Sequence, residues 1–170
     1  MILVDNDDPL ASAYRDMALP DSWAILTNPR GPLSELYNRA FKANPDLRWY
    51  GFLADDVVPE TPGFDRLLIA TAGRDGMAVP AGGETTGGAP HFVLGGDLVR
   101  SVGWLALPGL KRLYIDTVWV DIARARGVLR YRPDVTLRHD HFSNGKALFD
   151  ATYRKPRGDR AIYDAWRKTQ

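Results

Sequence analysis

The 170-residue chain contains no cysteine. Disulfide bonds, catalytic thiolates and cysteine-ligated metals are therefore excluded. A reducing, intracellular setting is compatible with this composition. Histidine is also scarce, with three in the whole chain, and two of them stand close together at positions 139 and 141.

Long apolar runs are missing as well. No stretch approaches the roughly 20 apolar residues that a helix needs to span a bilayer. The first four residues, Met1 to Val4, run directly into Asp5, with neither a basic start nor an apolar segment typical of a signal peptide. We therefore expect a cytoplasmic protein without a membrane partner.

The charges are unevenly distributed along the chain. Residues 1–99 contain 7 Lys and Arg and 14 Asp and Glu, whereas residues 100–170 contain 15 Lys and Arg and 7 Asp and Glu. Such a division suits a site that holds a cation and an anionic ligand together, but two solvated faces of opposite sign explain it more simply. The overall composition, 45% hydrophobic and 25% charged, is ordinary for a globular domain.

Apolar patterns predict strands that alternate with helices. The clearest helix begins after Pro32, because Leu33, Leu36, Tyr37, Ala40 and Phe41 recur at helical spacing. The run 49–53 does not alternate, which predicts a strand covered on both faces. We expect one domain, residues 1–170, with an α/β fold and a mixed, mainly parallel sheet flanked by helices. The predicted strands are 2–4, 23–27, 49–53, 77–79, 91–94 and 128–131, and the predicted helices are 10–17, 33–41, 63–72, 97–102, 116–126 and 161–168.

Two adjacent carboxylates, Asp55 and Asp56, follow the predicted strand 49–53. Ligands of open α/β sheets bind beyond the carboxyl ends of the strands. Two unpaired charges cannot be buried there, so they need water, hydrogen-bond donors or a cation. A divalent cation such as Mg2+ or Mn2+ prefers these oxygen ligands. A turn or helix cap explains the same residues equally well on spacing alone.

Three further polar residues are candidates for a site. His139 and His141 flank an aspartate in "RHDHF", where they could bind a metal or satisfy a strand end. Asp116 lies at the predicted start of a helix, where the helix dipole favours a carboxylate. Taken alone, Asp116 is more simply explained as a first-turn acid.

In combination these motifs resemble the glycosyltransferase family 2-like group with the GT-A fold, in particular the short glycosyltransferase-like proteins of tailed bacteriophages. Those proteins carry "FLGDD…P.TPGWD", "LVR..GW..LPGL..LY.D..W" and "H.H…GKA..D..Y". Here the counterparts are Phe52 to Asp65, Leu98 to Trp119 and His139 to Tyr153, so the resemblance covers nearly the whole chain. Ala54 stands where many family members have a third aspartate.

The resemblance implies a transfer of sugar from a UDP- or GDP-linked donor to an acceptor hydroxyl, by inverting direct displacement with Mn2+ or Mg2+. Asp56, with His139 and His141, would hold the metal, and Asp116 would be the general base. The nucleotide-sugar would contact Asp5, Arg30, Asn38 and Asp55. If phage-encoded, the protein would act in the host cytoplasm.

The chain begins at the counterpart of the family's second strand. The resemblance therefore implies a GT-A-like domain without the usual first strand, with a tail of about residues 143–170 packed as an appendage. An exposed sheet edge would favour a homodimer. Two alternatives stay open. Without the first strand the protein could be a non-catalytic GT-A-like binding or assembly protein. The paired carboxylates, the histidines and the basic C-terminal half would also suit a metal-dependent hydrolase or nuclease.

Overall fold

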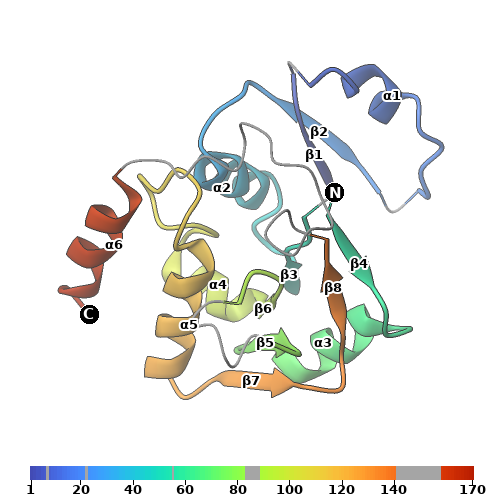
Figure 1. The fold of residues 1–170 in the computed structure, drawn as a ribbon. Coiled ribbons are helices and arrows are strands. Elements are labelled where there is room, and N and C mark those ends of the chain that lie inside the picture. Colours follow the sequence, from blue (N-terminus) through green and yellow to red (C-terminus); the bar gives the residue numbers. More distant parts are fainter. Residues whose placement is uncertain (7, 22, 55, 83–88, 141–157) are drawn as a thin grey trace.

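The computed structural model describes residues 1–6, 8–21, 23–54, 56–82, 89–140 and 158–170 (Figure 1). They form a mixed α/β structure in which most helices and strands agree with the sequence predictions to within a few residues. The elements are β1 (Ile2–Asp5), α1 (Ala11–Arg15), β2 (Ile25–Asn28), α2 (Leu33–Ala43), β3 (Trp49–Gly51), β4 (Val57–Pro59), α3 (Phe64–Ala72), β5 (Met77–Pro80), β6 (Val93–Gly95), α4 (Gly96–Val102), α5 (Ile115–Ala125), β7 (Leu129–Arg132), β8 (Leu137–His139) and α6 (Asp159–Arg167).

A four-stranded sheet in the order β3-β6-β5-β7 forms the centre of the fold. Strand β6 runs antiparallel to both β3 and β5, and β5 runs parallel to β7. The prediction of a mixed sheet is confirmed, but the prediction that it is mainly parallel is wrong for the described strands. Only residues 81–92 separate β5 from β6, and a connection this short favours an antiparallel pair over a parallel crossover.

Helices cover both faces of this sheet. Successive side chains of a strand point to opposite faces. In β5, Met77 and Val79 accordingly join a large core with α2, α4 and α5, whereas Ala78 joins a smaller core with α3. Trp119 of α5 lies at the centre of the large core, fully buried, and its indole donates to the Leu105 carbonyl at 2.7 Å.

Two small sheets lie outside the central one. Strands β1 and β2 form a parallel pair next to α1, and β4 and β8 form an antiparallel pair (Figure 1). Strand β3 is consequently an edge strand that ends at Gly51, and Leu53 is half exposed. The prediction of a strand over 49–53 buried on both faces is therefore wrong. The homodimer expected through an exposed sheet edge stays a prediction.

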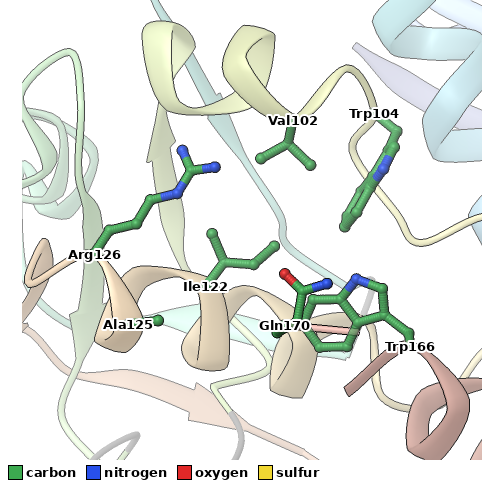
Figure 2. A pocket seen from close by; sticks show the side chains of 7 residues that line it. All are labelled: Val102, Trp104, Ile122, Ala125, Arg126, Trp166 and Gln170. Atoms are coloured by element: carbon green, nitrogen blue, oxygen red, sulfur yellow. The ribbon is translucent and has the colours of Figure 1, made fainter. Parts of the chain in front are cut away.

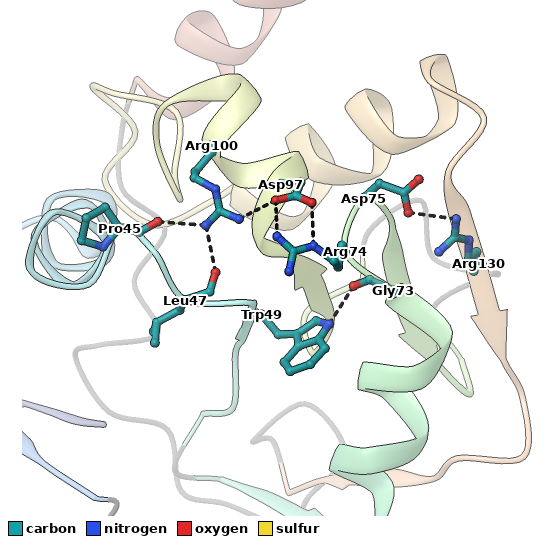
Figure 3. Close-up of polar contacts among 9 residues, drawn as sticks. All are labelled: Pro45, Leu47, Trp49, Gly73, Arg74, Asp75, Asp97, Arg100 and Arg130. Carbon is teal, nitrogen blue, oxygen red and sulfur yellow. Dashed lines mark hydrogen bonds and ion pairs between the residues drawn. The ribbon is translucent and has the colours of Figure 1, made fainter.

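The end of the sheet where β3 begins is held by a group of polar contacts (Figure 3). Asp97 of α4 accepts two hydrogen bonds from Arg74 and one from Arg100. Arg100 also donates to the carbonyls of Pro45 and Leu47. These contacts connect α4 with the segments that precede β3 and β5, and they leave the opposite end of β3 available for the site.

The C-terminal helix α6 is attached to the rest of the molecule through Asp159, which is almost fully buried. Its carboxylate accepts hydrogen bonds from the backbone N–H groups of Lys111, Arg112 and Leu113 at 2.8 to 3.0 Å. Tyr163 stacks on Tyr114 with ring centroids 4.9 Å apart. Within the described segments, no helix is long and apolar enough to cross a membrane.

Candidate functional site

Asp56 lies in the turn that connects the end of β3 to the start of β4. The amide of Val57 donates to the Ala54 carbonyl at 3.3 Å and closes this turn. Strand β4 then pairs with β8 so that Val57 lies opposite His139. The Asp140 amide donates to the Asp56 carbonyl at 2.7 Å and extends the pairing by one residue. Residues separated by 83 positions are thus brought side by side.

The side chains of Asp56 and His139 meet directly. The distance from Asp56 Oδ2 to His139 Nε2 is 3.0 Å, which is a hydrogen bond or, with a protonated imidazole, an ion pair. The two side chains are 21% and 33% exposed, so a ligand can reach them. Two of the three residues predicted to bind metal are therefore neighbours. The third, His141, and the adjacent Asp55 lie outside the described residues.

A third polar side chain, His91, belongs to the same group. Its ring packs edge-to-face against that of His139, with centroids 4.9 Å apart. His91 is only 7% exposed, and neither of its ring nitrogens has a hydrogen-bond partner among the described residues. Burial lowers its pKa to about 4, and the neighbouring His139 acts in the same direction, while Asp56 partly opposes them. At neutral pH this imidazole is uncharged.

His91 has no role in the sequence analysis beyond opening a predicted strand. A single histidine in an apolar strand carries little signal, since its importance comes from a neighbour 48 positions away along the chain. Its place at the end of a glycine-rich segment, next to a strand terminus, was the available hint.

The two histidines line a pocket of about 150 Å³. The other described lining residues are apolar, and they come from the end of β5, from the segment before β6 and from β8. The lining residues are Val79, Pro80, Ala81, Gly82, Ala89, Pro90, His91, Leu137 and His139. None of these nine residues carries a permanent charge.

The donors in this group fit a divalent cation that is shared with a ligand. Asp56 offers a carboxylate and His139 an imidazole, both of which bind Mn2+. In nucleotide sites, one or two protein ligands commonly suffice because phosphate oxygens and water complete the coordination. Among the residues that the structure describes, no group of three or more His, Asp or Glu side chains is arranged to hold a metal ion by itself.

Asp116, the predicted general base, lies in the first turn of α5 and is partly buried. The position agrees with the predicted helix start. Its carboxylate accepts a 3.4 Å hydrogen bond from the Thr117 hydroxyl. No described contact connects it to Asp56 or His139, so its role in catalysis stays a prediction.

The predicted nucleotide contacts fall in two places. Asp5 ends β1 and pairs in register with Asn28 of β2, and the exposed Arg30 follows two residues later. Because β1 and β2 are parallel, Asp5 and Arg30 belong to the same end of this small sheet. Asn38 of α2 instead braces the fold: its side chain accepts from the Leu105 and Ala106 amides and donates to the Ala106 carbonyl. Nucleotide binding by all three residues stays a prediction.

A second pocket, of about 260 Å³, lies between α4, α5 and α6 (Figure 2). It shares no residue with the histidine pocket. Its walls combine apolar side chains, including two tryptophans, with polar groups, and Arg126 donates to the Ser101 hydroxyl at 2.6 Å. The lining residues are Val102, Trp104, Ile122, Ala125, Arg126, Trp166 and Gln170.

Comparisons of the chain with protein-family models, with curated proteins and with solved structures find no match. The site must therefore be interpreted from its own residues and their chemistry.

Proposed function

We propose that the protein is a nucleotide-sugar-dependent glycosyltransferase with a GT-A-like domain, in which Asp56 and His139 hold a divalent cation, Mn2+ or Mg2+. The observation that carries the proposal is the 3.0 Å contact between these two side chains at the end of β3. Partial exposure of both side chains supports it, because a site shared with a phosphate ligand must be open on one side.

The chemistry that such a site supports follows from the charges that develop during transfer. The leaving nucleoside diphosphate gains negative charge, which a bound cation would stabilise. The acceptor hydroxyl loses its proton as it attacks the anomeric carbon, and a carboxylate must lie within hydrogen-bond reach of it. We assign this second task to Asp116. Direct displacement of this kind inverts the anomeric configuration.

A thermal-stability screen tests the proposal. Purified protein is heated with UDP- and GDP-linked sugars, with and without Mn2+, since a ligand at 100 times its Kd stabilises the folded state by about 2.7 kcal/mol. We expect stabilisation by at least one donor, dependent on Mn2+. Asp56→Asn should abolish it. Asp65→Asn, which makes the same change of charge at an exposed acid in α3, should not.

Two observations favour a second candidate, a binding module without transferase activity. Asp116 has no described contact with the Asp56–His139 pair, and the Asn38 amide is already satisfied by backbone groups. A binding module would retain Mn2+-dependent stabilisation by nucleotide, but it would release no nucleoside diphosphate from any donor. Measuring this release with the donors that bind separates the two functions.

A further inference from the structure

We infer that His91 and His139 line a subsite for the uncharged, hydroxyl-bearing ring of a sugar, next to the position proposed for the cation. This inference rests on the proposed function and extends it by naming the class of sugar. It depends on three observations: the unpartnered imidazole of His91, the size of the pocket and the absence of permanent charge on the nine described residues that line it.

The first observation concerns hydrogen bonds. A buried polar group without a partner is unfavourable by about 1–3 kcal/mol, and native structures rarely retain one without a purpose. His91 is more than nine-tenths buried, and both of its ring nitrogens are without a partner among the described residues. Because His91 lines the pocket, a ligand bound there could supply the missing partners.

The second observation concerns shape. A cavity of about 150 Å³ is large enough to bind a six-membered carbocycle such as benzene. The histidine pocket has this volume. One pyranose ring can therefore enter with part of its hydroxyl groups at the pocket mouth, where His139 is one-third exposed. A disaccharide cannot be enclosed.

The third observation concerns charge. The ring of His91 has two nitrogens that can take part in hydrogen bonds, and a hydroxyl group can both accept and donate. The two are thus complementary. None of the nine described lining residues carries a permanent charge that could neutralise a carboxylate, and the nearby Asp56 would repel one. Burying such a charge unpaired is strongly unfavourable, so uronic acids should bind more weakly than neutral sugars.

His91 is assigned to sugar rather than to metal because of its geometry. Its ring meets that of His139 edge-to-face, and the described residues contain no group of three ligands arranged around a common point. The cation and the sugar would therefore be bound by different but adjacent side chains, with His139 between them.

The test uses the full chain and nuclear magnetic resonance of its imidazole nitrogens. The chain has three histidines, so a long-range proton–nitrogen spectrum shows three ring systems. Methyl glucoside, methyl galactoside and methyl mannoside are titrated in turn, with glucuronate as the charged counterpart. We expect at least one neutral glycoside to shift the His91 ring nitrogens, with at least tenfold weaker binding of glucuronate. The inference is overturned if His91 shifts neither with any neutral glycoside, alone or with UDP and metal, nor with UDP-glucose, or if glucuronate binds equally well.

Two variants test the role of His91 itself. His91→Phe keeps a flat ring but removes both nitrogens, and we expect at least fivefold weaker binding of the responsive glycoside. His91→Gln retains one donor and one acceptor and should recover part of the affinity. Equal binding by the wild type and His91→Phe contradicts the assignment. If either variant fails to fold, the wild-type titration by itself decides the inference.

Further titrations with nucleotides distinguish this inference from the proposed function. They also show whether the subsite binds the donor sugar or the acceptor sugar. These titrations use diamagnetic Mg2+, because Mn2+ would broaden the signals of nearby imidazoles. If UDP-glucose shifts His91 in the presence of Mg2+ and UDP does not, the subsite holds the donor sugar. If methyl glycosides shift it only when UDP and Mg2+ are present, it holds the acceptor. If nucleotides bind with Mg2+ but no sugar reaches His91, the inference fails while the proposed function stands. If glycosides bind and nucleotides do not, the subsite stands and the transferase fails.

Discussion

His91 illustrates how a single buried side chain links the site to the stability of the protein. Its pKa is lowered from 6.5 to about 4, mainly by burial. In the unfolded chain the same imidazole takes up a proton as the pH falls through about 6.5. The unfolded state therefore binds more protons than the folded state between pH 6.5 and 4, and the free energy of unfolding must decrease as the pH falls through this window.

We predict that His91→Gln weakens this acid sensitivity. One pKa unit corresponds to about 1.4 kcal/mol, so His91 accounts for a decrease of about 2–3 kcal/mol between pH 7 and pH 4. Urea unfolding of both proteins at pH 7, 5.5 and 4.5 measures the difference. Carboxylates also lose favourable contacts in acid, which is why the comparison with His91→Gln is needed. Parallel pH curves for the two proteins would contradict the prediction.

Residue-level chemistry was predictable where the sequence places charge at a strand end. Asp56 and His139 were singled out for this reason, and the structure brings them into contact. His91 was missed because its importance arises from its contact with His139, which is far away in the sequence. Asn38 was assigned to a ligand, yet its side chain braces the 105–106 segment. A polar side chain that satisfies buried backbone cannot be told from a binding residue by its type alone.

At the scale of elements, α6 depends on one buried carboxylate. We predict that Asp159→Asn destabilises the protein by about 2–3 kcal/mol. The amide replaces one acceptor oxygen by an NH2 group, which cannot accept hydrogen bonds from the backbone N–H groups of residues 111–113. Urea unfolding gives the loss, and hydrogen exchange should become faster in α6 and in residues 111–113.

Asp164→Asn is the matched control for this variant. Asp164 lies in the same helix, but its carboxylate is half exposed and faces Arg160 at 3.5 Å. Exposed pairs of this kind contribute little, so the cost should stay below about 0.5 kcal/mol. Similar losses for the two variants would mean that the backbone contacts of Asp159 do not hold α6 in place.

At the junction of β6 and α4, Gly95 and Gly96 leave no room for a side chain. A Cβ atom on Gly96 would lie 2.1 Å from the Leu47 carbonyl oxygen, and one on Gly95 would lie 2.2 Å from the Arg74 backbone. We predict that Gly96→Ala costs about 3 kcal/mol or more, since backbone must move to accommodate it. Thermal unfolding measures the effect.

Gly31→Ala provides the comparison for this substitution. A Cβ atom on Gly31 would meet its nearest neighbour, the Pro29 carbonyl oxygen, at an ordinary 3.8 Å. This variant should unfold within a few degrees of the wild type. A Gly96→Ala protein as stable as Gly31→Ala would show that the segment around Leu47, before β3, does not approach the start of α4 this closely.

Helices and core strands were predictable because each carries its own periodic pattern. The helix α2 was expected from Leu33 onward and begins there, and α5 begins one residue before the predicted position. The pair β4–β8 was not foreseen. Each of these strands has three residues, and β4 includes a proline, so neither has enough pattern to be recognised without its distant partner.

At the scale of the whole molecule, the acidic and basic halves of the chain interleave. Ion pairs join Arg130 to Asp75, Arg138 to Glu60, and Arg100 to Asp97 across the two halves (Figure 3 shows the first and the last). The charge asymmetry of the sequence is therefore offset in part by pairing within the fold. Exposed pairs stabilise weakly, so the asymmetry itself is a poor guide to function.

The arrangement of the sheets could not be deduced from local patterns either. Strand order and direction depend on which non-adjacent segments pair, and here β6 enters between β3 and β5. The α/β class follows from alternating elements, whereas the antiparallel pairs of the central sheet required the three-dimensional structure. The site depends on this arrangement, because only the β4–β8 pair brings Asp56 to His139.

The central claim is that Asp56 helps to hold a divalent cation shared with a nucleoside diphosphate. Calorimetric titration of the wild type with UDP and with GDP, each in Mn2+ and in excess chelator, tests it most directly. We predict binding of at least one nucleotide in Mn2+, at least tenfold weaker binding in chelator, and the same loss in Asp56→Asn but not in Asp65→Asn. Absence of binding in Mn2+, or binding that is indifferent to both Mn2+ and Asp56, would contradict the claim.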